Sequence, residues 1–284
     1  MILVDLNQVM ISNVLQQIGT SGDLDENLFR HMILNSLRSY KSKFGAKYGD
    51  IIICCDDRHF WRRDEFPYYK AHRKKARTES KHDWDMIFAV LNEVRSDLET
   101  YFPYLVIGVE RAEADDVIAA LCHDHGRVLG ASPPILILSS DKDFVQLQKY
   151  SNVEQYSGIQ KKFVRHPNPE LYLQEHIMKG DRGDGVPNFL SDDDTFVTEK
   201  RQKPIEKKKL AVWVELEPEE FCDENMLRNW HRNNTLVNLD NVPDEIRKSV
   251  SDIYNNGPKG DRSKLFGYFV KKKLKGLMES IGDF

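Results

Sequence analysis

The chain has 284 residues, of which 40% are hydrophobic and 30% are charged, and its formal net charge is −4. This length allows one sizeable core with a smaller attached lobe, and the composition excludes a disordered protein. No apolar run approaches the length of a membrane span, and the N-terminus lacks the features of a signal peptide. With four cysteines and no CxxC pair, we expect a cytoplasmic protein with reduced thiols and no membrane partner.

Short apolar strands alternate with helical patterns in the first part of the chain. Strands are predicted at residues 1–5, 51–55, 104–107 and 135–138. Helices are predicted over 24–44 with Gly45 as the stop, and over 83–102, 113–125 and 168–179. The fully apolar run from Ile51 to Cys55 is typical of a strand buried on both faces. The alternation predicts an α/β fold with a parallel sheet and right-handed crossovers.

The character of the sequence changes after about residue 187. Residues 188–209 are polar and charged with little periodicity, which predicts a mobile loop. Helical patterns follow near 217–232, 243–255 and 261–281. We therefore predict a domain over residues 1–187 and a mostly helical C-terminal lobe over 188–284.

Acidic residues gather where this architecture places its binding sites. In an open parallel sheet, ligands bind beyond the carboxyl ends of the strands. Five elements carry acidic residues at strand ends, at a helix start or in a glycine-rich turn: Asp5; Asp56; Glu113, Asp115 and Asp116; Asp141 and Asp143; Asp181 and Asp184. One acidic residue in such a place is usually a helix cap or a solvated turn. Five elements converging on one rim favour a functional site instead.

A cluster of this kind indicates metal-dependent phosphoryl chemistry. Many carboxylates at one site repel each other unless cations are present, and hard oxygen ligands select Mg²⁺ or Mn²⁺. Two such ions stabilise both the attacking and the leaving oxygen in phosphodiester hydrolysis. We therefore predict two Mg²⁺ ions, for which Mn²⁺ can substitute.

A basic and aromatic segment begins two residues beyond Asp56. Between residues 58 and 81 there are nine Lys or Arg against three Asp or Glu, and aromatic residues interleave with them. Such a composition suits a segment that holds phosphates with cations and stacks bases on rings. The alternative is a solvated basic loop, but the position beside a predicted metal ligand favours nucleic acid. Few aliphatic residues and a net charge of +6 over 58–82 also predict little packing on a core and partial mobility without substrate.

The order of these motifs resembles the flap endonuclease and 5′-3′ exonuclease family, and within it the ribonuclease H branch of T-even-type bacteriophages. The matching segments are Val4-Asp5, Cys55-Asp56, Trp61–Arg63, Tyr69–Arg73, Glu113–Asp116, Ser140–Asp143, Gly180–Asp184 and Leu265–Lys271. They span nearly the whole chain. The resemblance implies a 5′ nuclease with exonuclease, flap endonuclease and ribonuclease H activity that removes RNA primers and flaps during DNA replication. It implies DNA and RNA·DNA duplexes with 5′ ends or flaps as partners. It also implies a monomer, the host-cell cytoplasm if the gene is phage-borne, and replication proteins such as a single-stranded-DNA-binding protein or sliding clamp as candidate partners.

The resemblance also implies roles for individual residues. Ligands of the first metal would be Asp5, Asp56, Glu113, Asp141 and either Asp115 or Asp116; those of the second would be Asp143, Asp181 and Asp184. Residues 58–82 match a helical arch, with Tyr69, Lys70 and Arg73 as catalytic residues at its active-site end. The predicted nucleic-acid contacts are Arg62, Arg63, Lys74, Lys75 and Arg77. The C-terminal lobe would bind DNA, although Val186–Asp192 replaces the family's usual Gly-Ile-Gly turn.

Two other functions are weighed against this one. An aspartyl-phosphate phosphatase needs a second acid two residues after its nucleophile, and Asp5-Leu6-Asn7 lacks it. A flap-binding protein without catalysis predicts that metal ligands are lost, whereas all nine acidic positions are present. In the last helical pattern we expect core packing with a basic outer face, and Ile281–Phe284 is left as a candidate docking segment for a replication partner.

Overall fold

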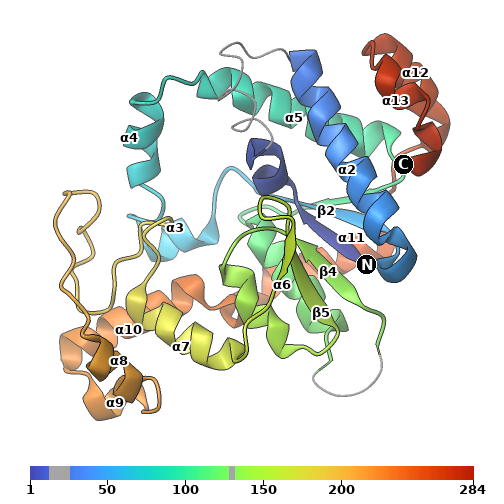
Figure 1. The fold of residues 1–284 in the computed structure, drawn as a ribbon. Coiled ribbons are helices and arrows are strands. Elements are labelled where there is room, and N and C mark those ends of the chain that lie inside the picture. The colour runs from blue at the N-terminus through green and yellow to red at the C-terminus, as the bar shows by residue number, and fades with distance from the viewer. Residues whose placement is uncertain (13–25, 128–131) are drawn as a thin grey trace.

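The computed structural model describes residues 1–12, 26–127 and 132–284 (Figure 1). Its sheet has the order β3-β2-β1-β4-β5-β6. The strands are β1 (Ile2–Asp5), β2 (Ile51–Cys55), β3 (Leu105–Gly108), β4 (Ile135–Leu138), β5 (Val153–Ser157) and β6 (Lys162–Val164). Strands β1 to β5 run parallel to one another, and β6 pairs antiparallel with β5 at the edge of the sheet. The predicted α/β fold with a parallel sheet is confirmed.

Helices connect and cover the strands. Residues 6–12 are helical. The longer helices are α2 (Glu26–Tyr48), α5 (Trp84–Tyr101), α6 (Ala114–His125), α7 (Pro169–Lys179), α10 (Glu224–Val237) and α11 (Asp244–Asn256). The shorter ones are α3 (Trp61–Glu65), α4 (His72–Thr78), α8 (Lys207–Trp213), α9 (Pro218–Phe221), α12 (Leu265–Lys271) and α13 (Lys275–Met278). The 3₁₀ helices are η1 (Asp143–Lys149), η2 (Leu239–Asn241), η3 (Arg262–Lys264) and η4 (Ile281–Asp283). Among the helices of these described residues, none combines the length and apolarity that a membrane span needs.

Both faces of the sheet are buried, because successive side chains of a strand point to opposite sides. Ile2 and Val4 of β1 pack in one apolar cluster with α2, α5 and the C-terminal helices. Leu3 between them packs in a second cluster with α6 and α11. This explains why β2, β4 and the first three positions of β1 are apolar on both faces.

Several element boundaries differ from the predicted ones. Helix α2 does not stop at Gly45 but runs on to Tyr48, because Phe44 and Tyr48, one turn apart, are both buried in the core. The predicted start at residue 24 lies outside the described residues. Strands β5 and β6 were not predicted, because their polar residues interrupt the apolar pattern of a strand. Helix α8 begins at Lys207, within the last three residues of the predicted 188–209 loop, and continues past its end. The rest of that loop forms turns in which Asn188 donates to Lys203 O at 2.8 Å, and its mobility stays a prediction.

The C-terminal part does not form the single lobe that was predicted. Helices α8, α9 and α10 gather beside α7, whereas α11 covers one face of the sheet (Figure 1). Helices α12 and α13 lie beside α2 and α5, and α12 packs on the end of α5 through Tyr268 and Phe269. The predicted 217–232 helix is the pair α9 and α10, and the predicted 261–281 helix is broken between α12 and α13 at Lys273, whose φ is 57°. Phe284 is 3% exposed and packs on Phe102 and Phe269. The last residue thus belongs to the core, which contradicts a free docking segment at 281–284.

The basic segment 58–82 is partly anchored and partly free. In α3 and the turn after it, Trp61, Phe66 and Tyr69 are buried, so the prediction of little core packing is wrong there. In α4 no residue is buried, and this helix lies between α3 and α5, away from the sheet (Figure 1). The segment therefore spans the site as an arch whose first foot is fixed in the core.

Candidate active site

The acidic rim forms at the carboxyl ends of adjacent strands. Asp5 ends β1, Asp56 follows β2, and Asp141 follows β4, while β2, β1 and β4 are neighbours in the sheet. All three line one cleft of about 1400 Å³, together with Glu113, Asp115 and Asp184. The same cleft is lined by basic residues of the arch: Lys70, Arg73, Lys74 and Arg77. Six of the nine predicted metal ligands therefore share one cavity with the predicted arch.

At the N-terminus of α6, the side chains of the adjacent residues Asp115 and Asp116 lie in different surroundings. Asp116 is fully buried, pairs with Arg62 at 2.7 Å and accepts a hydrogen bond from Trp61 Nε1 at 3.1 Å. It also accepts from Glu113 N at 2.8 Å and so closes a capping box. Asp115 instead lines the cleft. Of the two candidates, Asp115 is therefore the one placed to contact an ion, and Asp116 holds Arg62.

The carboxylates along the strand ends lack cationic partners. Among the described residues, no Lys or Arg forms an ion pair with Asp5, Asp56, Asp115 or Asp141. Burial, reinforced by Asp56, raises the pKa of Asp5 to about 7. Burial and the neighbouring Asp143 raise the pKa of Asp141 to about 7, and burial with Asp141 and Asp5 raises the pKa of Asp115 well above its usual value. These oxygens repel one another and leave room for external cations.

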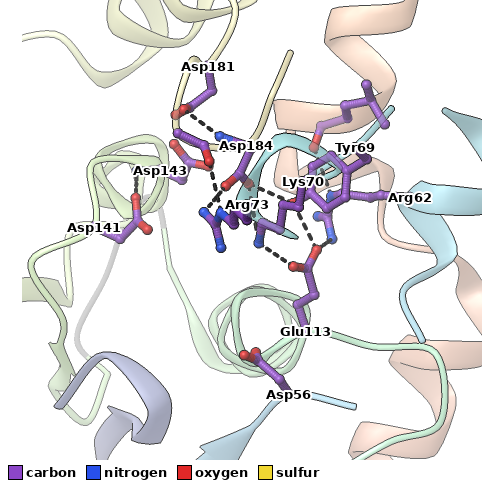
Figure 2. A network of polar contacts seen from close by, with 12 residues as sticks. Asp56, Arg62, Tyr69, Lys70, Arg73, Glu113, Asp141, Asp143, Asp181 and Asp184 are labelled. Atoms are coloured by element: carbon purple, nitrogen blue, oxygen red, sulfur yellow. Dashed lines mark hydrogen bonds and ion pairs between the residues drawn. The ribbon is translucent and has the colours of Figure 1, made fainter. Parts of the chain in front are cut away.

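Glu113 and Asp184 are in the opposite situation, because the foot of the arch neutralises them (Figure 2). Lys70 Nζ forms an ion pair with Glu113 and lies 3.4 Å from Asp184 Oδ2, and Arg73 lies 2.6 Å from Asp184 Oδ1. The Tyr69 hydroxyl lies 2.9 Å from Glu113 and 2.7 Å from Asp184. Burial alone would raise the pKa of both carboxyls, but Lys70 and its basic neighbours lower it below the usual value.

Backbone geometry locks the arch foot to the glycine-rich turn that follows α7. Lys70 has a φ of 55°, and its N–H donates to Asp184 O at 2.7 Å. Gly185 has a φ of 75°, and a Cβ there would lie 2.8 Å from His72 Nδ1. Only glycine fits this approach without strain. The turn thereby presents Asp184 to the arch.

Asp143 and Asp181 lie beside the cleft with a residue that sequence reasoning missed. His176 Nε2 lies 2.9 Å from Asp143 Oδ1 and 3.8 Å from Asp181 Oδ2. One ligand atom from each of the three residues fits within 4.8 Å. Burial opposes protonation of His176, but the hydrogen bond and charge of Asp143 outweigh it and raise the pKa of the imidazole. The sequence holds no signal that distinguishes this histidine from the others.

The predicted nucleic-acid residues fall into two groups. Arg63, Lys74 and Arg77 line the cleft. Burial and the nearby Arg73 and Arg63 lower the pKa of Arg77, as expected where cations crowd without an anion. Lys75 lies outside the cleft lining and pairs with Glu199.

Arg62 departs from the prediction of a nucleic-acid contact. It is 2% exposed, and its guanidinium is held by Glu113 and Asp116 and by Leu236 O, the last at 2.8 Å. All these partners face inward, so the structure makes Arg62 an internal support of Glu113.

Comparisons with known proteins agree with this architecture. Residues 16–177 match the family model of the 5′-3′ exonuclease N-terminal resolvase-like domain, and residues 167–284 match that of the T4 RNase H C-terminal domain. The chain is 33% identical to the ribonuclease H of Enterobacteria phage T4 over 99% of its own length and 95% of that protein.

Solved structures of bacteriophage T5 proteins share the fold. A T5 flap endonuclease in a pseudo-enzyme–product complex with DNA and metal ions aligns with a TM-score of 0.62 at 16% identity, over 89% of this chain and 97% of that one. The T5 5′-exonuclease with bound zinc aligns with a TM-score of 0.60 at 16% identity, over 91% and 99% of the two chains. At this identity the likeness concerns the fold.

Proposed function

The chain belongs to the 5′-3′ exonuclease family, and from that premise we propose that it is a structure-specific 5′ nuclease with exonuclease, flap endonuclease and ribonuclease H activity. It would remove RNA primers and flaps during DNA replication. One observation carries the proposal: carboxylates that form no ion pair with Lys or Arg among the described residues share one cleft with the basic residues of the arch. Such a cleft suits a phosphodiester whose charge is shared between metal ions and basic side chains.

The donor set fits two hard divalent cations. Asp5, Asp56, Asp115 and Asp141 would hold the first ion, with Glu113 at its edge, and Asp143 and Asp181 would hold the second, with Asp184 nearby. The buried Asp143 Oδ1 contacts His176 Nε2 at 2.9 Å and has no other hydrogen-bond partner among the described residues, so it remains available to an ion. When bound, Mg²⁺ or Mn²⁺ would supply charge stabilisation for the attacking and leaving oxygens of hydrolysis.

The chain's own residues would bind and orient the scissile phosphate. Lys70 and Arg73 lie at the arch foot and line the cleft, so they can stabilise negative charge that develops on phosphate oxygens. The Tyr69 hydroxyl, between Glu113 and Asp184, would position both carboxylates. Arg62 would hold Glu113 from behind.

The arch would bind the 5′ strand. Arg63, Lys74 and Arg77 line the cleft beyond Lys70, and Arg63 and Arg77 lie over the rings of Phe60 and Phe88 at 4.9 Å. Cations interleaved with aromatic rings suit single-stranded nucleic acid of either sugar. Both DNA and RNA·DNA duplexes with 5′ ends or flaps are therefore proposed as substrates.

Cleavage of labelled substrates tests the proposal. The chain is incubated with a 5′-flap DNA duplex or a 5′-labelled RNA·DNA hybrid, in Mg²⁺ or in excess chelator. We expect short 5′ products in Mg²⁺ and none in chelator. Tight flap binding without any product would favour the flap-binding alternative, and undiminished cleavage in chelator would exclude the two-metal proposal.

A further inference from the structure

A histidine outside the cleft lining faces two of the proposed ligands. His176 lies in the last turn of α7, Asp143 is the first residue of η1, and Asp181 follows α7 after Gly180. The His176 Nε2 atom is 2.9 Å from Asp143 and 3.8 Å from Asp181. The three side chains thus offer one nitrogen and two oxygen donors within 4.8 Å of one another.

Two donor atoms of this group contact each other. Asp143 is 8% exposed, and its Oδ1 lies 2.9 Å from His176 Nε2; both atoms are buried, and neither has another hydrogen-bond partner among the described residues. In the same part of the chain, no Lys or Arg forms an ion pair with Asp143 or Asp181. Buried polar atoms normally have partners. Here, within the described residues, the only partner of each atom is the other member of the group, and such convergence of a nitrogen and carboxylate oxygens is the arrangement that ligands of a cation have.

Neighbouring residues hold the three groups in this geometry. The imidazole stacks on Tyr172, one turn earlier in α7, with ring centroids 5.9 Å apart and an interplanar angle of 23°. Gly180 has a φ of 65°, and a Cβ there would lie 2.4 Å from Val186 O. This turn brings Asp181 back toward the helix end. The histidine and the carboxylate are therefore fixed before any ion arrives.

We propose that His176 Nε2 is a metal ligand together with Asp143 and Asp181, which makes the second cation position a mixed nitrogen and oxygen site. The proposal rests on the proposed function, since it concerns one of its two ions, and it adds a metal preference. Imidazole suits transition ions, whereas carboxylate and water suit Mg²⁺. The site therefore favours Mn²⁺ or Co²⁺ over Mg²⁺ more than an all-oxygen site would.

Pulsed electron paramagnetic resonance of bound Mn²⁺ gives the most direct test. A tag-free chain is loaded with Mn²⁺ alone, without nucleic acid, and ¹⁴N couplings are recorded by echo modulation. His176→Gln keeps a neutral side chain of similar reach but offers an oxygen. His231→Gln, on the exposed face of α10, is the matched control.

The expected result is an imidazole ¹⁴N coupling that is lost in His176→Gln and retained in His231→Gln. Competition with Mg²⁺ should also show a smaller preference for Mn²⁺ in His176→Gln than in the parent chain. Bound Mn²⁺ without the coupling, or a coupling that survives His176→Gln, would overturn the inference and leave the proposed function standing. Tighter Mn²⁺ binding in His176→Gln would show that the histidine acts as a competing cation, which also overturns it. Failure to bind Mn²⁺ at all would overturn both proposals.

Discussion

The acidic cleft has two groups of carboxylates, at the strand ends and at the foot of the arch, and among the described residues only the second group is neutralised by Lys and Arg side chains. On the strand-end side, burial and mutual repulsion raise the pKa values of Asp5 and Asp141 to about 7. On the arch side, burial acts in the same direction on Glu113 and Asp184, but Lys70 and its neighbours lower their pKa values. Two groups of carboxylates in one cavity thus have opposite protonation behaviour.

The difference indicates a division of labour. The arch-side carboxylates Glu113 and Asp184 already pair with Lys70 and Arg73, so we infer that they position these two cations. The strand-end carboxylates have no such pairs among the described residues, and we infer that external cations neutralise them. Because the basic arch is anchored to Asp184 and Glu113 through its foot, the arch and the acidic rim are fixed relative to each other.

The largest expected effect is on the strand-end side. Asp141→Asn removes one charged ligand where no side-chain cation can compensate, and we expect turnover to fall on the order of a thousandfold, since metal stabilisation of the transition state is worth several kcal/mol. Single-turnover cleavage of a 5′-flap duplex measures this. Asp64→Asn, an exposed change beside Arg111, is the control and should be neutral. Equal loss in both variants would contradict the account.

A smaller effect is expected on the arch side. Lys70→Ala should slow saturated turnover by about a hundredfold, the usual cost of one electrostatic contact to the reacting group. Flap binding, measured by fluorescence anisotropy in Ca²⁺, should change little. Weaker binding with unchanged saturated turnover would show that Lys70 contacts the substrate strand rather than the reacting phosphate, and would contradict the proposed role of the arch foot.

The outer arch should affect binding rather than turnover. Lys74→Ala and Arg77→Ala should each weaken flap binding and reduce the slope of log K against log salt by about 0.7, the value for one phosphate contact in single strands. Lys75→Ala is the matched control, because Lys75 pairs with Glu199 and does not line the cleft. A smaller salt dependence of flap binding for Lys75→Ala than for Lys74→Ala would show that Lys75, and not Lys74, contacts a phosphate.

The smallest effect concerns stability without metal. Asp5 and Asp141 have pKa values of about 7 in the folded chain, above the ordinary value of 3.8. Their contribution to stability is therefore present below pH 4 and lost as the pH rises through 7. In chelator, the Tm of the parent chain should fall by a few degrees between pH 5 and pH 8, and the Tm of Asp141→Asn should fall by less over the same range. Calorimetric scans across this range would contradict the account if the parent chain gained stability instead.

Much of this site could be predicted from sequence, because strand ends are recognisable and a parallel sheet brings them to one edge. Asp5, Asp56 and Asp141 were located in this way. The choice between Asp115 and Asp116 was not, since neighbouring helix positions point in different directions and only packing shows which one faces Arg62.

The errors have a common physical cause. Composition cannot tell a cation that faces phosphate from one that turns inward, so Arg62 was placed on the nucleic acid. A lone histidine carries no pattern, so His176 was missed, although the turn after α7 brings Asp181 beside it. Long-range packing also determined that α11 covers the sheet and that α12 packs on α5, rather than forming a separate lobe.

We expect the strand-end carboxylates to need external cations, whereas Lys70 and Arg73 already neutralise the arch-side carboxylates. Titration calorimetry with Mg²⁺ at pH 6.5, in two buffers of different protonation enthalpy, measures the protons released on binding. The account predicts net proton release, because Asp5 and Asp141 must ionise to bind the ion, and a smaller release in Asp141→Asn than in Asp64→Asn. Mg²⁺ binding without proton release, or equal release in both variants, would contradict it.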